Sequence, residues 1–236
     1  NVTFIVTHDC NLRCSYCYEH NKSKAEMSLE TAKKAVDTLF DTDLANGLWI
    51  NPEEADGLIL DFIGGEPLMK IDLIDQIMDY FLSRAVALNH RWATRYMISM
   101  SSNGVLYHTE RVQRFLRKWE GRVSIGITID GDQETHDACR VDCNGCGSYE
   151  AAAAAFRDAL RRFGMDGTKF TIAPGNVDKV FQATTDIIER FDLVRFFSNC
   201  VYEEGWTTEH ATILYEQLKK TVDWLVETDR LDTTFF

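Results

Sequence analysis

The stretch VTFIVTHDCNLRCSYCYE, residues 2–19, joins a strand-like run to a loop that holds three cysteines. The run VTFIVT (2–7) is rich in β-branched residues, which favour a strand. Cys10, Cys14 and Cys17 follow it at spacings of four and three. These cysteines could be buried filler, halves of disulfides, zinc ligands or the ligands of an iron–sulfur cluster.

Five further runs share the strand-like character of residues 2–7, and stretches with helical spacing separate them. The expected strands are 57–63, 95–101, 123–129, 169–173 and 193–199. One expected helix follows Ser28. The others cover 67–89, 109–119, 148–163, 176–190 and 207–228. Strands that alternate with long crossovers predict a parallel sheet. Six such units are too few for a closed eight-stranded barrel, so we expect an α/β fold, either an open partial barrel or a doubly wound sheet, in one domain.

Both architectures place ligands in the loops that follow the carboxyl ends of the strands. The loops to inspect are therefore 8–27, 64–67, 102–108, 130–147, 174–176 and 199–206.

Composition narrows the class of protein. The formal net charge of −12 argues against nucleic acid or an anionic membrane as the partner. The 236 residues contain neither an apolar run long enough to span a membrane nor a secretion signal, so we expect a cytoplasmic protein. Seven cysteines in such a chain indicate reduced thiols and thus metal or redox chemistry.

Three cysteines on one loop are too many to be buried filler. Zinc would need a fourth ligand, for which His8 or His20 is available. A 4Fe-4S cluster held by three thiolates keeps one iron open for chemistry.

The segment CNLRCSYC resembles the CxxxCxxC motif of the radical S-adenosylmethionine (SAM) superfamily. The resemblance implies a partial (βα)6 TIM-like barrel of parallel strands with outer helices. It also implies that Cys10, Cys14 and Cys17 bind a 4Fe-4S cluster whose open iron is chelated by SAM. In this family an electron from the cluster cleaves SAM to a 5'-deoxyadenosyl radical, which abstracts hydrogen from the substrate. Tyr16 matches an aromatic position that lies along the adenine.

The second expected strand ends in GGEP, residues 64–67. A tight turn into a helix with proline at its first position explains the glycines and Pro67, but not the glutamate. The resemblance implies that Glu66 receives the methionyl amine of SAM. Gly64 and Gly65 let the backbone approach the ligand, and a carboxylate accepts hydrogen bonds from an ammonium group.

Two later loops carry weaker matches. SSNGVL (101–106) is similar to a TNG-like segment of the family, and Asn103 either contacts SAM or forms an Asn-Gly turn. TIDGDQETHDACR (128–140) is similar to a stretch whose serine and arginine bind the SAM carboxylate. The matching residues are Thr128, which departs from serine but keeps the hydroxyl, and Arg140, whose planar fork suits a carboxylate. We expect Asp130 and His136 to order the loop and not to catalyse.

A second cysteine triplet, Cys139, Cys143 and Cys146, repeats the spacing of the first. It could be a second metal site or an accessible thiol pair. Alternatively, two cysteines lie in a flexible turn beside a third that packs. The sequence leaves these possibilities open.

The segments IAPGNVD (172–178) and NCVYEEGW (199–206) are similar to the peptide-maturase branch of the family. This resemblance implies a catalytic core over residues 1–236, without the N-terminal extension and the C-terminal auxiliary-cluster (SPASM) domain of longer members. The implied partners are a precursor peptide or protein and a reductant such as flavodoxin or ferredoxin. Glu203 and Glu204 are candidate substrate contacts. A sulfatase-maturating enzyme and a non-catalytic zinc-binding interaction module are the alternatives.

Overall fold

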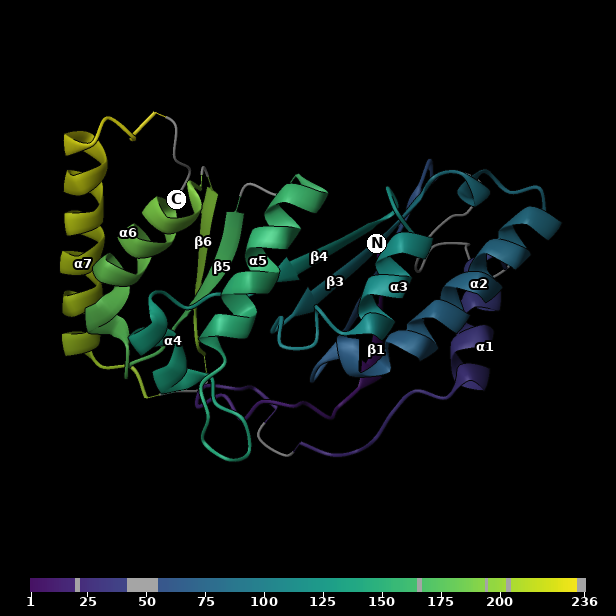
Figure 1. The fold of residues 1–236 in the computed structure, drawn as a ribbon, viewed down its shortest axis with the longest axis horizontal. Coiled ribbons are helices and arrows are strands. Elements are labelled where there is room, and N and C mark those ends of the chain that lie inside the picture. The colour runs from purple at the N-terminus through teal and green to yellow at the C-terminus, as the bar shows by residue number, and fades with distance from the viewer. Residues whose placement is uncertain (20–21, 42–54, 165–166, 194, 203–204, 233–236) are drawn as a thin grey trace. The chain divides into compact units, whose positions relative to one another are not determined.

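The computed structural model describes residues 1–19, 22–41, 55–164, 167–193, 195–202 and 205–232, and strands alternate with helices along them (Figure 1). The strands are β1 (Val2–Thr7), β2 (Leu58–Gly64), β3 (Tyr96–Ser102), β4 (Val123–Ile127), β5 (Gly167–Ile172) and β6 (Arg195–Cys200). The α-helices are α1 (Leu29–Leu39), α2 (Ile71–Ala87), α3 (Glu110–Lys118), α4 (Gln133–Cys139), α5 (Tyr149–Phe163), α6 (Val180–Phe191) and α7 (Thr208–Glu227). The 3₁₀ turns are η1 (Pro67–Lys70), η2 (Arg91–Ala93) and η3 (Val177–Lys179). The α/β class and its six strand–helix units are confirmed.

The chain forms two compact units, each assembled from separate segments. Unit 1 contains Asn1–Cys10, Asn21–Ser102 and Leu106–Ile125, and unit 2 contains Asn11–His20, Asn103–Val105 and Gly126–Phe236. Neither unit is a contiguous stretch that composition could mark as a domain. The single core domain over residues 1–236 therefore stays a prediction.

The sheet of β1 to β4 runs in chain order and belongs to unit 1 except for the last residues of β4. Its first three strands are parallel, and Phe4 pairs with Phe62 across β1 and β2. The two rings stack with their centroids 5.4 Å apart, and both side chains are buried. Alternate residues such as Ile5 and Ile59 are exposed on the other face. The period of two thus separates a buried face from an open one.

The α-helices of unit 1 each bury one stripe of residues, and α1 also begins at a side-chain cap. The Ser28 hydroxyl accepts a hydrogen bond from the Thr31 amide and caps α1. Pro67 opens η1, which leads directly into α2. α2 buries Ile74, Ile77 and Phe81 at helical spacing.

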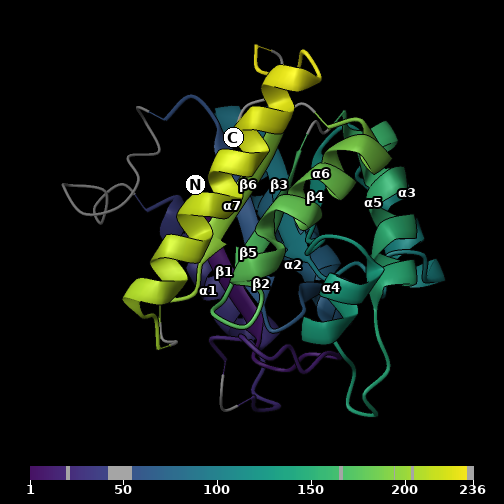
Figure 2. The same ribbon diagram turned by 90° about the vertical axis from the view of Figure 1, so that its left-hand side faces the viewer.

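Unit 2 contains the two-stranded parallel sheet of β5 and β6. The hydroxyl of Thr168 on β5 donates to the carbonyl of Ile127, which ties this sheet to the end of β4. Phe156 on α5 packs edge-on against Phe191 on α6, with ring centroids 4.8 Å apart. α7 lies beside α6 (Figure 2).

The loop expected over residues 130–147 contains α4, so that expectation is wrong for Gln133–Cys139. The Asp132 side chain caps α4 by accepting from the Thr135 amide. Ser148 precedes α5, but its hydroxyl does not cap the helix. The Asp137 carboxylate, reached from α4, accepts from the amides of Ser148 and Tyr149 instead. α4 thus supplies the cap of the helix that follows it.

Within the described part of the chain, none of the helices combines the length and the apolar character needed to cross a membrane.

Candidate functional site

The cysteine loop of unit 2 runs antiparallel to the segment that follows α4. The Arg13 amide donates to the Val141 carbonyl at 2.6 Å, and the Ser15 amide donates to the Cys139 carbonyl at 2.9 Å. Cys14 and Cys17 close a turn in which the Cys17 amide donates to the Cys14 carbonyl. Backbone of the second cysteine triplet therefore braces the loop that carries two cysteines of the first.

Cys10 is the last residue of the first segment of unit 1, and its side chain is buried. Its amide donates to the Asp9 carboxylate at 2.9 Å. None of the seven cysteines, all of which are among the described residues, forms a disulfide. Among the described residues, no three His, Cys, Asp or Glu side chains form a group that could hold a metal ion. The binding of a cluster by Cys10, Cys14 and Cys17 stays a prediction.

Gly64 and Gly65, at the end of β2, lie against the backbone that follows β1. A Cβ on Gly64 would stand 2.2 Å from the Thr7 carbonyl oxygen, and one on Gly65 would stand 2.2 Å from that of Asp9. Any larger residue would push these two loops apart. The glycines thus have a structural reason to be there, in addition to the ligand role expected of them.

Glu66 caps η1 and is almost completely buried in unit 1, at 1% exposure. Its Oε1 accepts from the Leu68 amide at 3.0 Å and from the Ser102 hydroxyl at 2.8 Å. Its own amide donates to the Asp9 carbonyl. A buried carboxylate whose orientation is fixed by these contacts is well placed to receive a cation.

Asn103 is also buried, and its side chain orders the loop after β3 in unit 2. Its amide nitrogen donates to the Asn11 side chain at 2.8 Å, and its oxygen accepts from the Val105 amide. These contacts match the turn that the Asn-Gly pair predicts. The SAM contact expected of Asn103 stays a prediction.

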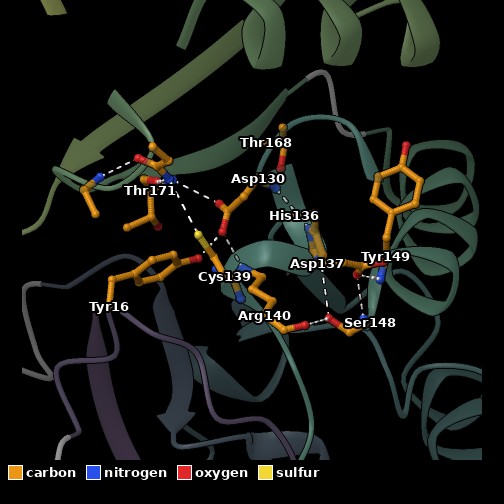
Figure 3. Close-up of polar contacts among 12 residues, drawn as sticks. Tyr16, Asp130, His136, Asp137, Cys139, Arg140, Ser148, Tyr149, Thr168 and Thr171 are labelled. Atoms are coloured by element: carbon orange, nitrogen blue, oxygen red, sulfur yellow. Dashed lines mark hydrogen bonds and ion pairs between the residues drawn. The ribbon is translucent and has the colours of Figure 1, made fainter. Parts of the chain in front are cut away.

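Asp130 joins three segments of unit 2 and is fully buried (Figure 3). Its Oδ2 accepts from the Tyr16 hydroxyl and, at 2.6 Å, from the Arg140 Nε. Its Oδ1 accepts from the Thr171 amide of β5 at 3.0 Å. One carboxylate therefore connects the cysteine loop, the residue after α4 and a strand.

Arg140 is held on one edge only. Its side chain is 10% exposed, and its guanidinium lies over the Tyr16 ring, 5.5 Å from the centroid. Burial alone would lower the pKa of Arg140, but the charge of Asp130 outweighs it and raises the pKa overall, so the group stays cationic. Its two terminal amino groups make no hydrogen bond to any described residue. They can accept an anionic ligand.

Tyr16 and Thr128 complete this part of the site. Burial and the charge of Asp130 raise the pKa of the Tyr16 phenol well above its usual value, so it remains a hydrogen-bond donor. Thr128 directly follows β4, is half-buried, and its hydroxyl makes no hydrogen bond to a described residue. Of the expected SAM contacts, Tyr16 and Arg140 are thus brought together, and Thr128 has an uncommitted hydroxyl.

His136 orders the loop that holds Asp130 through hydrogen bonds of both its ring nitrogens, the role expected from the sequence. Its Nδ1 accepts from the Asp130 amide, and its Nε2 contacts the Ser148 hydroxyl at 3.1 Å. That hydroxyl donates to the Arg140 carbonyl. Burial and the nearby Arg140 charge lower the pKa of His136 to about 4. The neutral ring therefore carries its proton on Nε2 and links Asp130 to Arg140 through Ser148.

The second cysteine triplet is divided between two environments. Cys139 ends α4, and its sulfur accepts from the Asn176 side chain at 3.9 Å. Cys143 and Cys146 are exposed on a hairpin closed by a bridge between Val141 and Gly147. This arrangement matches the third possibility, two cysteines in a turn beside one that packs.

Sequence reasoning missed two contributors to the site. One is Asp137, which accepts from the Ser148 amide just before the next helix. The other is the contact between Tyr16 and Asp130, which are 114 positions apart, so no local pattern connects them. The only available signal was an aspartate directly after an expected strand, where ligands and loop-ordering residues gather. The expected substrate contacts Glu203 and Glu204 lie outside the described residues.

The sequence of this chain is similar to those of several curated proteins. The chain is 28% identical to Fe-coproporphyrin III synthase of Methanosarcina barkeri over 97% of its own length and 51% of that protein. It is 28% identical to the antilisterial bacteriocin subtilosin biosynthesis protein AlbA of Bacillus subtilis, covering 59% of the chain and 26% of the relative. It is 27% identical to a cysteine-type anaerobic sulfatase-maturating enzyme of Clostridium perfringens, covering 83% and 50%. The chain spans about half the length of these relatives, or less.

A solved structure of anSMEcpe with bound AdoMet and Kp18Cys peptide has a related fold. It matches 98% of this chain and 61% of its own with a TM-score of 0.70 at 20% identity. The shared fold supports the partial barrel that the sequence resemblance implies.

The family comparison is more specific. The model of the radical SAM superfamily matches residues 4–186, a range that holds the cysteine loop, Glu66 and the Asp130–Arg140 pair. Taken separately, the open edge of Arg140 in unit 2 suits a carboxylate, and the buried Glu66 in unit 1 suits an ammonium group. Their contacts with SAM stay predictions. By its match to the family model, the chain belongs to the radical SAM superfamily, whose cofactors are a 4Fe-4S cluster and S-adenosylmethionine.

Proposed function

We propose that this radical SAM enzyme modifies a ribosomally synthesised peptide by forming a thioether or carbon–carbon crosslink. The proposal is supported by the similarity to AlbA, which acts in subtilosin biosynthesis, and to a sulfatase-maturating enzyme. The similar fold of a structure with a bound peptide also agrees with it.

Different residues of the chain would bind the cluster and the methionyl amine of SAM. Cys10, Cys14 and Cys17 would hold the cluster, and Glu66 would receive the methionyl amine. When bound, cluster and SAM together supply the radical that takes hydrogen from the substrate.

The remaining contacts to SAM come from the loops after the strands. Thr128 and Arg140 would bind the carboxylate, and Tyr16 would lie along the adenine. Gly64, Gly65 and Asn103 would shape the loops around them. The observation that carries this assignment is the buried Arg140, whose terminal amino groups have no partner among the described residues.

Charge favours a peptide over a tetrapyrrole. The relative matched over 97% of this chain makes an iron porphyrin, by its name, and tetrapyrroles of this kind carry several carboxylates. A net charge of −12 repels polyanionic ligands at long range and attracts basic peptides. A tetrapyrrole is therefore the second candidate, and the experiment below includes it.

The sulfatase-maturating activity is the alternative within the peptide class. In that reaction a cysteine or serine of the target protein is oxidised to formylglycine and no crosslink forms. The similarity to the Clostridium perfringens enzyme, over 83% of this chain, makes it a necessary comparison.

The test is anaerobic turnover with SAM, a chemical reductant and three substrates. These are a candidate precursor peptide from a neighbouring gene, a cysteine-containing sulfatase peptide and an iron tetrapyrrole from which iron coproporphyrin would be made. We expect mass spectrometry to show loss of two hydrogen atoms from the first peptide only, with 5'-deoxyadenosine formed alongside. Formylglycine in the sulfatase peptide, or conversion of the tetrapyrrole, would overturn the crosslinking proposal. Cys14→Ala is the control and should give no product.

The biological partners are proposed on the same basis. Flavodoxin or ferredoxin would supply the electron, in the cytoplasm. A zinc-binding interaction module predicts instead a colourless protein, whereas the cluster gives a brown one that absorbs near ~400 nm.

A further inference from the structure

We propose that Asp130 positions the Arg140 guanidinium for recognition of the SAM carboxylate. This inference rests on the proposed function, because it assigns a role toward the carboxylate that Arg140 would bind. Asp130 itself would touch neither the carboxylate nor the adenine.

The geometry of the Asp130 carboxylate supports this role (Figure 3). The same oxygen, Oδ2, accepts from the Tyr16 hydroxyl and from the Arg140 Nε, so one atom fixes the separation of both side chains. The other oxygen accepts from the Thr171 amide of β5 and fixes the carboxylate itself. Asp130 is therefore immobilised on both sides.

The choice of Nε is informative. An arginine that pairs through Nε on its side edge leaves its end edge open, where one N–H from each terminal amino group forms a fork for a second anion. Arg140 makes no hydrogen bond through those groups to any described residue, although its side chain is only 10% exposed. Asp130 thus aims the fork without blocking it.

Charge is also arranged for this purpose. A buried guanidinium needs a counter-charge, and Asp130 supplies it inside unit 2. The Tyr16 ring beneath the guanidinium limits its tilt, and the Tyr16 hydroxyl is held by the same carboxylate. Tyr16 therefore supports the orientation that Asp130 gives to Arg140.

The behaviour of two SAM fragments separates positioning from general structural support. S-adenosylhomocysteine keeps the amino acid and the adenine, whereas 5'-methylthioadenosine keeps the adenine but has no carboxylate. If Asp130 aims Arg140, Asp130→Asn should weaken only the ligand that carries a carboxylate. If Asp130 merely holds the fold, both ligands should be affected alike.

The experiment is isothermal titration of both ligands into the cluster-reconstituted protein. For Asp130→Asn we expect about tenfold weaker binding of S-adenosylhomocysteine, equivalent to ~1.4 kcal/mol, and less than about twofold change for 5'-methylthioadenosine. Asp186→Asn, which removes a carboxylate from a more exposed pair of the same unit, is the matched control and should change neither. Equal weakening of both ligands, or no weakening, would overturn the proposal.

Arg140→Gln distinguishes this inference from the function on which it rests. If Arg140→Gln leaves the affinity for S-adenosylhomocysteine unchanged, the proposed carboxylate contact is wrong. If Arg140→Gln weakens binding but Asp130→Asn does not, only the positioning role is wrong.

A double variant covers the case in which Asp130→Asn alone does not fold, because a buried arginine without its partner is costly. In the Arg140→Gln background no unpaired cation remains. There, adding Asp130→Asn should cause no further loss of S-adenosylhomocysteine binding. A further loss of the same size as in the wild type would show that Asp130 does not act through Arg140.

Discussion

The two cysteine triplets have the same spacing and different surroundings. Next to the first, Tyr16 reaches a buried carboxylate and an arginine with an open edge. In the second, Cys139 packs at the end of α4, while Cys143 and Cys146 stand exposed on a hairpin. The difference teaches that CxxxCxxC spacing identifies a candidate, and that the side chains around it decide whether a cofactor can be held there.

The second triplet nevertheless contributes to the first. Its backbone pairs with the cysteine loop through Arg13 and Ser15, and Arg140 lies between Cys139 and the hairpin. The backbone of residues 139–141 thus supports the loop that carries Cys14 and Cys17.

The largest expected effect is on 5'-deoxyadenosine formation, when one thiol of the first triplet is removed. Removing one thiol of the second triplet is the comparison. Cys17→Ser should abolish 5'-deoxyadenosine formation, because a missing ligand disrupts the cluster. Cys146→Ser should leave the rate unchanged, because Cys146 is exposed on the hairpin and assigned to no cofactor. Chromatographic quantification of 5'-deoxyadenosine under anaerobic reduction measures both. Equal losses in the two variants would end the distinction between the triplets.

Removing one partner of the buried ion pair beside the first triplet should be costly. Arg140→Gln leaves the buried Asp130 without its counter-charge, and we expect the free energy of unfolding to fall by about 3 kcal/mol. Urea denaturation of the cofactor-free protein measures the change. Arg190→Gln, which breaks a more exposed pair with Asp186, should cost less than ~1 kcal/mol. Similar values for both variants would contradict the special character of Asp130 and Arg140.

His136, which links Asp130 to Arg140 through Ser148, should make the free energy of unfolding depend on pH. Its pKa is lowered by burial from the usual 6.5 to about 4, so below pH 6.5 the unfolded chain binds the proton that the folded chain refuses. Its contribution is fully favourable above pH 6.5 and is lost as pH falls toward 4. Between pH 7 and pH 5 the loss should be ~2 kcal/mol.

The matching measurement is urea denaturation at both pH values. His136→Asn should be less stable at pH 7 but should lack this part of the pH dependence. His108→Asn, at an exposed position, should behave as the wild type does. An unchanged pH dependence in His136→Asn would show that another group titrates.

The smallest effect is expected at the hairpin of the second triplet. The Asp142 carboxylate accepts from the amides of Asn144 and Cys146, contacts that also lower its pKa. Asp142→Ala should speed hydrogen exchange of those two amides and leave 5'-deoxyadenosine formation unchanged. A substantial loss of activity would instead give the hairpin a part in the reaction.

Much of the fold around the site can be predicted from the sequence, because it depends on local patterns. The strand before GGEP, the Ser28 cap and the period of two in β1 all depend on neighbours in the chain. The resemblance to the radical SAM superfamily then predicted the residues to inspect.

The missed features depend on contacts that local patterns do not contain. α4 has seven residues and mostly polar side chains, so it shows no apolar period. The Asp137 cap on α5 and the Tyr16–Asp130 contact join distant positions and are formed only by tertiary structure. For the same reason spacing alone could not distinguish the two cysteine triplets.

We expect one cluster per chain, bound by the first triplet alone. Iron and acid-labile sulfide counted on the anaerobically reconstituted protein test it directly. We expect about four of each per chain in the wild type and in the Cys143→Ser/Cys146→Ser variant, and almost none when Cys10, Cys14 and Cys17 are replaced by alanine. About eight irons per chain in the wild type, falling to about four in the hairpin variant, would contradict the account.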